Sequence, residues 1–182
     1  MATYSQNIIL LCTSIDDDVK SYAVDFELRL IPTWERKGHV TTEFANIVDR
    51  CVKILSSRYR EIEEVLKVVR IEFRLTDSSL RPRITYSSTL PIFIGLAQLF
   101  RTYLLRKNAE IIICGTGRVE NNGDISPVEN LIIKLRAFEK ALKSNLFVGE
   151  YFLATPQDFK NVWEVLDLVK QGSKGRPIVK NR

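Results

Sequence analysis

The stretch 109–143 constrains the fold most, because its pattern changes from strand to turn to helix within a short distance. It opens with a run of apolar and β-branched residues over 109–114, which is typical of a buried strand. Gly115 and Gly117 follow this run. Glycines at the end of a strand predict a bulge or a close approach of another backbone segment.

A tight turn and a helix complete this stretch. Asn121-Asn122-Gly123 suits the positive φ angles of a tight turn, so a short return strand is expected at 124–125. A helix is predicted over 128–143. Lys134 is expected just outside its buried stripe, with its stem along apolar surface. The stripe has the i, i+3, i+4, i+7 spacing of one helix face and comprises Val128, Leu131, Ile132, Leu135, Phe138 and Leu142.

Apolar periodicity predicts the remaining elements and an α/β (α+β) fold class. Strands are expected over 7–15, 21–31, 69–75 and 146–154, and helices over 42–56, 58–68, 87–105 and 155–169. The first two strands suggest a hairpin. The segment 92–99 is apolar almost all round, which predicts a helix in the middle of the domain. We expect one domain over 1–171 and a basic, disordered tail over 172–182.

The charge distribution argues against nucleic-acid binding by the folded body. The net charge is +5, but five basic residues lie within 170–182, and the rest of the chain carries 22 basic and 22 acidic residues. Only weak binding of anionic partners through the tail is therefore expected. No apolar run of membrane-spanning length and no basic leader is evident, so the sequence predicts a cytoplasmic protein without membrane contact.

The cysteines and the single histidine narrow the chemistry further. Cys12, Cys51 and Cys114 lie in apolar runs without metal-ligand spacing, so they are interpreted as buried free thiols in a reducing compartment. His39 is the only histidine, and its loop-like setting is typical of a surface residue. A Ser-His-Asp triad and a histidine-rich zinc site are therefore not expected, and we expect neither a metal nor a cofactor.

The order of elements in 109–143 resembles the proteolytic domain of the Lon protease family. Members of that family carry a strand ending in Thr-Gly, a turn with Gly, and then Val-x-Pro-[Val/Ile]-Gly-Gly-Leu-x-x-Lys-Leu. This chain has Thr116-Gly117, Gly123 and then ISPVENLIIKL over 125–135. Lys134 falls on the family's catalytic lysine, whereas Glu129-Asn130 replaces the Gly-Gly pair. The resemblance extends over about 7–170 and implies a ribosomal protein S5 domain 2-like architecture.

The resemblance also implies a nucleophile. Family members carry Pro-Lys-Asp-Gly-Pro-Ser-Ala-Gly before the central helix, where this chain has PRITYSST over 82–89. Counting from Pro82 places Ser87 on the catalytic serine, and Ser88 is the alternative nucleophile. A serine hydroxyl needs a base within reach, and a lysine can serve as that base only if its pKa falls. Backbone N–H groups over 87–89 are the expected donors to the oxyanion.

Two functions of different classes follow. The first is a Lon-like serine endopeptidase that uses a Ser-Lys dyad on protein or peptide substrates without its own ATPase. The second is a catalytically inactive Lon-like domain that serves as an oligomerisation or protein-interaction module, with the residues over 87–89 acting only as helix caps. The resemblance also implies a homo-oligomer and a separate ATPase or regulatory partner. Nucleotide binding through Gly115-Thr116-Gly117 is disfavoured, because no third glycine and no helix follow.

Overall fold

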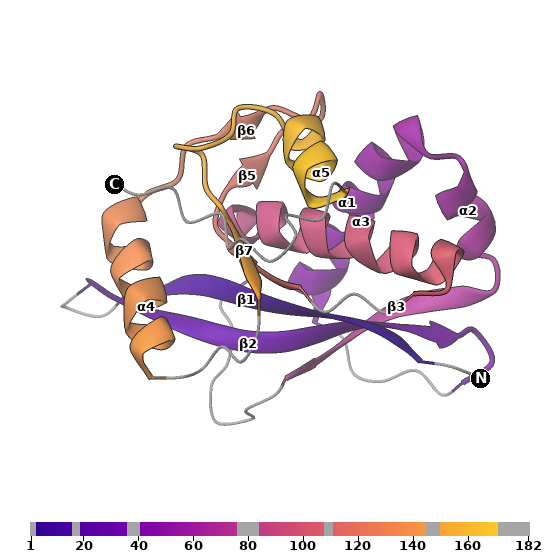
Figure 1. The fold of residues 1–182 in the computed structure, drawn as a ribbon, viewed down its shortest axis with the longest axis horizontal. Coiled ribbons are helices and arrows are strands. Elements are labelled where there is room, and N and C mark those ends of the chain that lie inside the picture. Colours follow the sequence, from indigo (N-terminus) through magenta and orange to yellow (C-terminus); the bar gives the residue numbers. More distant parts are fainter. Residues whose placement is uncertain are drawn as a thin grey trace.

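The computed structural model of the protein describes residues 3–15, 19–35, 41–75, 84–107, 111–144 and 150–170. Its centre is a five-stranded mixed sheet with the strand order β3-β2-β1-β4-β7 (Figure 1). The strands are β1 (Tyr4–Ile15), β2 (Val19–Pro32), β3 (Val69–Leu75), β4 (Ile112–Gly115) and β7 (Tyr151–Ala154). A separate two-stranded sheet contains β5 (Arg118–Val119) and β6 (Ile125–Ser126). The fold is therefore mixed α/β.

The strand pairings follow the order of the chain only from β1 to β3, because β4 pairs with β1 and not with β3. β1 and β2 form the predicted antiparallel hairpin, from the Tyr4↔Leu30 pair to the Ile15↔Val19 pair, and β3 continues antiparallel to β2. β4 is parallel to both β1 and β7. Parallel neighbours need a crossover connection, and the helix between β4 and β7 provides it. The return strand predicted after Asn121-Asn122-Gly123 is β6, which pairs with β5.

Helices cover both faces of the sheet. They are α1 (Thr42–Arg58), α2 (Glu61–Val65), α3 (Thr89–Leu105), α4 (Leu131–Lys143) and α5 (Val162–Lys170), with a 3₁₀ turn over Tyr86–Ser88. Successive strand residues point to opposite faces. Even-numbered residues of β1, from Ile8 to Cys12, pack with α1, α3 and α5, whereas Ile9 and Leu11 pack with α4.

α3 is the central helix that its apolar sequence predicted. Its residues from Thr89 to Leu96 are all buried, and it runs across the sheet below α5, with α1 passing behind it (Figure 1). By length and composition the segment Tyr86–Leu105 could also cross a membrane, but 67% of its apolar 18-residue window is buried inside the fold. Such burial is typical of the core helix of a globular domain.

α4 differs from the prediction in its start and in its buried face. It begins at Leu131, after Asn130 in the left-handed conformation (φ 58°), and not near residue 128. Ile132 is 66% exposed, whereas Lys134 is only 4% exposed and lies within the buried face with Ala137 and Ala141. The expected stripe was therefore wrong at Ile132, and the expectation that Lys134 lies just outside the buried face was wrong as well. α4 packs against β1 and β2 with the face that carries Lys134, and Ile132 lies outside that face.

The boundaries of two other helices also differ from the prediction. α2 covers only part of the predicted 58–68 helix, and α5 begins at Val162, after turns over 156–158. Phe159 and the apolar face of α5 are buried as predicted. The expectations for His39 and for the tail over 172–182 fall on residues that the structure does not describe. All three cysteines are buried and free, as predicted.

At two of the predicted positions, Gly115 and Gly123, the backbone has a geometry that favours glycine. A Cβ atom at Gly115 would collide with the backbone carbonyl oxygen of Ala154 on β7, so only glycine allows the two strands to pair this closely. Gly123 has a φ angle of 91° in the turn before β6, a conformation that favours glycine.

Candidate active site

Ser87 and Lys134 meet at the junction of three segments that are far apart in the sequence. Lys134 Nζ lies 3.1 Å from Ser87 Oγ, although 47 residues separate them along the chain. Ser87 belongs to the 3₁₀ turn before α3, and Lys134 belongs to the first turns of α4. The structure therefore brings together the two residues that the motif spacing paired.

The end of β4 holds the serine segment in place. The N–H of Gly117 donates to the carbonyl oxygen of Ser87 at 2.8 Å, and the N–H of Leu90 donates to the carbonyl oxygen of Gly117 at 2.9 Å. A Cβ atom at Gly117 would lie 2.7 Å from Leu90 Cδ2, so the two segments are in close contact. These contacts join the start of α3 to the strand-end Thr116-Gly117 motif.

Two threonine hydroxyls flank the Ser-Lys pair. Thr116 is 1% exposed, and its Oγ1 atom accepts from Lys134 Nζ at 3.3 Å and donates to the Ser87 carbonyl oxygen at 3.4 Å. On the other side, Thr85 Oγ1 lies 2.8 Å from Ser87 Oγ. The nucleophile candidate is thus in contact with one amine and one hydroxyl.

Ser88, the alternative nucleophile, is placed differently. Its side chain is buried, and its Oγ accepts the backbone N–H of Thr85 at 3.3 Å. This contact is one half of a capping box, in which the N3 side chain, here Ser88, accepts from the backbone N–H of the N-cap residue, here Thr85. Of the two serines, Ser87 is the one whose Oγ atom lies 3.1 Å from Lys134 Nζ.

The Ser-Lys pair opens onto a cleft of about 630 Å³. Its walls come from β1, from the turn before α3, from β5 and from the loop before α4. The side chain of Glu129 is exposed at this cleft. The lining residues are Cys12, Thr13, Ser14, Thr85, Tyr86, Ser87, Arg118, Pro127, Val128, Glu129, Asn130 and Lys134.

The backbone donors over 87–89 are arranged differently from the expectation. The N–H of Ser88 donates to the Thr85 carbonyl oxygen at 2.9 Å, and the N–H of Thr89 donates to the Tyr86 carbonyl oxygen. Both groups are used within the 3₁₀ turn, so they do not point to an oxyanion in this conformation. The expected oxyanion site is therefore not formed by these two N–H groups.

A buried thiol lies next to the site along β4. Cys114 precedes Gly115 and Thr116 and is 0% exposed. Burial raises the pKa of the Cys114 thiol well above its ordinary value, and a hydrogen bond with the Gly115 backbone offsets this only partly. The thiol is therefore neutral and contributes no negative charge beside Thr116.

Sequence reasoning did not identify the residues that surround the pair. Thr116 was noted only as part of the Thr-Gly motif, and Thr85, Tyr86 and Arg118 were not proposed as site residues. For Thr116 the sequence offered one signal, the Thr-Gly motif, because a threonine at a strand end next to a glycine can lie close to another backbone segment. The positions of the other three depend on contacts between distant segments.

Compared with models of protein families and with curated proteins, the sequence matches none. The assignment of the site therefore depends on the motif resemblance and on the geometry of the described residues.

Proposed function

We propose that this protein is a Lon-like serine endopeptidase that hydrolyses protein or peptide substrates with a Ser87–Lys134 dyad. The observation that carries the proposal is the 3.1 Å distance between Ser87 Oγ and the buried Lys134 amine. A base within about 2.6–3.2 Å of a hydroxyl can accept its proton as the oxygen attacks. The order of the Thr-Gly, Pro and Lys motifs supports the same proposal.

The reaction has two successive stages, acylation of Ser87 and hydrolysis of the resulting ester, with two proton transfers in each. Ser87 Oγ attacks the carbonyl carbon of the scissile peptide while its proton passes to Lys134 Nζ, and the ammonium then protonates the leaving amine as the C–N bond breaks. Water attacks the resulting ester, Lys134 accepts its proton, and the proton returns to Ser87 Oγ when the carboxylic product leaves. No other reactant is needed.

The surroundings of the lysine suit a base. The side chain is 4% exposed, and burial disfavours the charged form of a lysine amine. Thr116 Oγ1 contacts the amine at 3.3 Å and so fixes its direction toward Ser87. An amine held in this way loses little conformational freedom when the substrate binds.

The test compares cleavage of a denatured protein by the wild type and by single-residue variants. Ser87→Ala and Lys134→Ala should each lower the rate by roughly a thousandfold or more, because the two groups act as a unit. Ser88→Ala should remain active, and so should Lys140→Ala, which removes an exposed lysine from the same helix. Activity that survives Lys134→Ala would refute the dyad.

A second candidate is a catalytically inactive Lon-like domain that acts as an oligomerisation or protein-interaction module. The observation that favours it is the use of the Ser88 and Thr89 N–H groups within their own turn, since an acyl transfer needs donors directed at the oxyanion. Glu129-Asn130 in place of two glycines also changes the loop beside Lys134. This reading predicts no cleavage of any denatured protein and no reaction with serine-directed reagents.

A further inference from the structure

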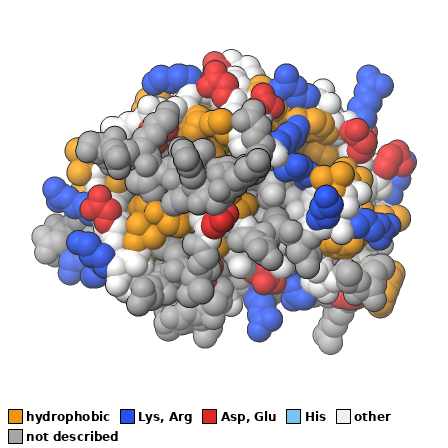
Figure 2. Space-filling view, viewed as in Figure 1, with side chains coloured by type: hydrophobic (Ala, Val, Ile, Leu, Met, Phe, Trp, Pro, Cys, Tyr) orange, Lys and Arg blue, Asp and Glu red, His pale blue; other side chains and the backbone are white. Residues whose placement is uncertain are grey.

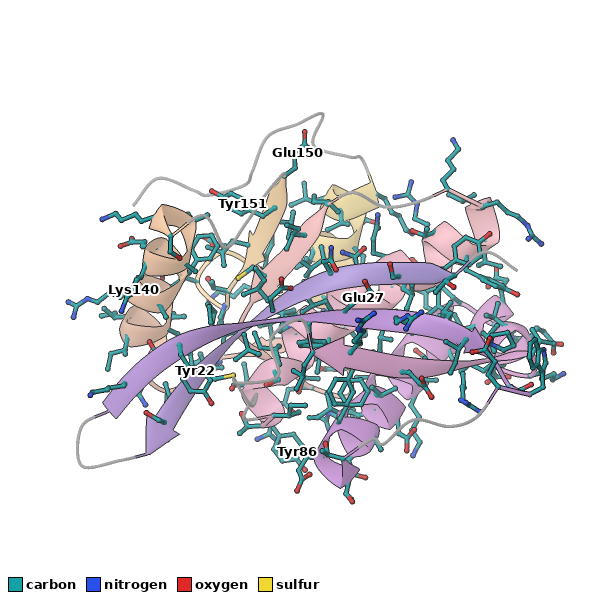
Figure 3. All side chains as sticks on the ribbon, turned by 90° about the horizontal axis from the view of Figure 1, so that it is seen from below. Tyr22, Glu27, Tyr86, Lys140, Glu150 and Tyr151 are labelled. Carbon is teal, nitrogen blue, oxygen red and sulfur yellow. The ribbon has the colours of Figure 1, made fainter. Side chains whose placement is uncertain are left out.

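One wall of the cleft is both cationic and aromatic. Tyr86 directly precedes Ser87 and is 58% exposed. It lies on the outside of the molecule, beside α1 and the start of α3 (Figure 3). The guanidinium carbon of Arg118 lies 5.0 Å from the centre of the Tyr86 ring, and that of Arg50 lies 6.0 Å from it. Tyr86 and Arg118 both line the cleft.

The position of Arg118 relative to the serine is fixed by the backbone. Arg118 follows Gly117, whose N–H donates to the Ser87 carbonyl oxygen at 2.8 Å. Arg118 Nε lies 3.0 Å from Glu120 Oε1, and that oxygen also accepts from Ser126 Oγ at 2.7 Å. Among the described residues this is the only ion pair of Arg118, and no described acceptor bonds to its terminal Nη groups, so these groups can bond to a ligand.

The charges around this wall do not cancel. Arg50 donates through Nε and Nη2 to the Val119 carbonyl oxygen, and its Nη2 lies 3.5 Å from Glu120 Oε2. Two arginines therefore share one carboxylate on the Tyr86 side of the cleft. Glu129 lies in the loop before α4, where it would repel an anion. Basic and acidic side chains are interspersed on the face drawn in Figure 2.

We propose that Arg118 and Tyr86 form a specificity subsite that binds a carboxylate of the substrate peptide next to the scissile bond. This inference rests on the proposed function and names its substrate class. A guanidinium whose two Nη groups bond to none of the described residues matches the planar, bidentate geometry of a carboxylate. The exposed Tyr86 ring offers apolar area to the neighbouring part of the peptide. The carboxylate comes from an Asp or Glu side chain or from the C-terminus of the peptide.

The test measures binding to the Ser87→Ala variant by fluorescence anisotropy, so that it does not depend on cleavage. Three dye-labelled peptides of one length are compared: a Glu peptide with an amidated C-terminus, the Gln peptide with an amidated C-terminus, and the Gln peptide with a free C-terminus. At least one carboxylate peptide should bind roughly tenfold or more tightly than the amidated Gln peptide, because hydrogen bonds to charged groups are strong. Preference for the first indicates a side-chain carboxylate, and preference for the third indicates a chain terminus.

Substitution of Arg118 tests whether the carboxylate preference depends on the proposed subsite. Adding Arg118→Gln should abolish it, whereas Arg136→Gln, at an exposed position of α4, should leave it unchanged. Equal binding of all three peptides, or a preference that survives Arg118→Gln, would overturn the inference. A carboxylate preference in a protein that cleaves nothing would refute the proposed peptidase but not the subsite. Cleavage without that preference would refute only the subsite.

Discussion

At the scale of single residues, the Thr116 hydroxyl contacts both members of the proposed dyad. It accepts from Lys134 Nζ at 3.3 Å and donates to the Ser87 carbonyl oxygen at 3.4 Å. Thr116→Val removes these contacts with little change in volume. We expect kcat to fall about 2- to 10-fold, as the loss of one hydrogen bond predicts, with KM nearly unchanged.

A matched control separates this effect from a loss of stability. Thr102→Val removes another buried hydroxyl, which bonds to the Gln98 carbonyl oxygen at 2.8 Å within α3. It should lower the free energy of unfolding by a comparable amount and leave kcat unchanged. Equal kcat values in the wild type and Thr116→Val would show that the threonine does not position the lysine.

The approach of Ser87 to Lys134 was expected from the resemblance to the Lon motifs, which give both residue types and their approximate separation. The choice between Ser87 and Ser88, which counting from Pro82 made in favour of Ser87, does not follow from residue type, since either serine can cap a turn. It depends on the Thr85–Ser88 contact and on the Gly117–Ser87 bond, which involve backbone conformation and a distant strand. The same limit applies to Arg118, whose place at the cleft follows from the pairing of β5 and β6.

At the scale of elements, α4 decides whether the lysine faces the cleft. Leu135 is 3% exposed and packs with Ile9, Leu11 and Phe138, whereas Ile132 is 66% exposed. Leu135→Ala should lower the free energy of unfolding by about 2–5 kcal/mol. Ile132→Ala should change it by less than about 0.5 kcal/mol. Denaturant unfolding of the two variants measures both values, and the opposite order would show that α4 presents a different face to the sheet.

The strands β1, β2 and β3 and the helix α3 were predictable because their apolar patterns match their burial over many residues. β4 and β7 are shorter than the predicted strands over 109–114 and 146–154, parts of which lie outside the described residues, and β5 was not predicted. The start of α4 was not predictable, because the apolar pattern continues back to Val128 while the helix begins only after the left-handed Asn130. The pattern also assigned Ile132 to the core. Periodicity gives the spacing of a stripe but does not choose between two adjacent stripes, and the docking of α4 on β1 and β2 makes that choice.

At the scale of the whole molecule, the buried thiols make stability depend on alkaline pH. Burial raises the pKa of Cys114 well above its ordinary value of 9.0, whereas an unfolded chain leaves the thiol near that value. Its stabilising contribution is therefore full below about pH 9 and is lost as the pH rises toward the folded-state pKa. The free energy of unfolding should fall above pH 9.

Replacing the thiol tests this pH dependence. In Cys114→Ala the decline above pH 9 should be shallower by up to about 1.4 kcal/mol per pH unit, because one fewer group ionises on unfolding. Thr102→Val should keep the wild-type slope. Denaturant unfolding at several pH values gives the slopes, and equal slopes in the wild type and Cys114→Ala would contradict the burial argument.

The measurement that tests the central claim most directly is the site of covalent modification by a fluorophosphonate, a reagent that reacts with activated serines. Digestion and mass spectrometry locate the adduct. The account predicts an adduct on Ser87 that is lost in Lys134→Met, a change that removes the amine and keeps an unbranched side chain, and retained in Lys140→Met. An adduct confined to another residue, or labelling of Ser87 that is undiminished in Lys134→Met, would contradict the Ser87–Lys134 dyad.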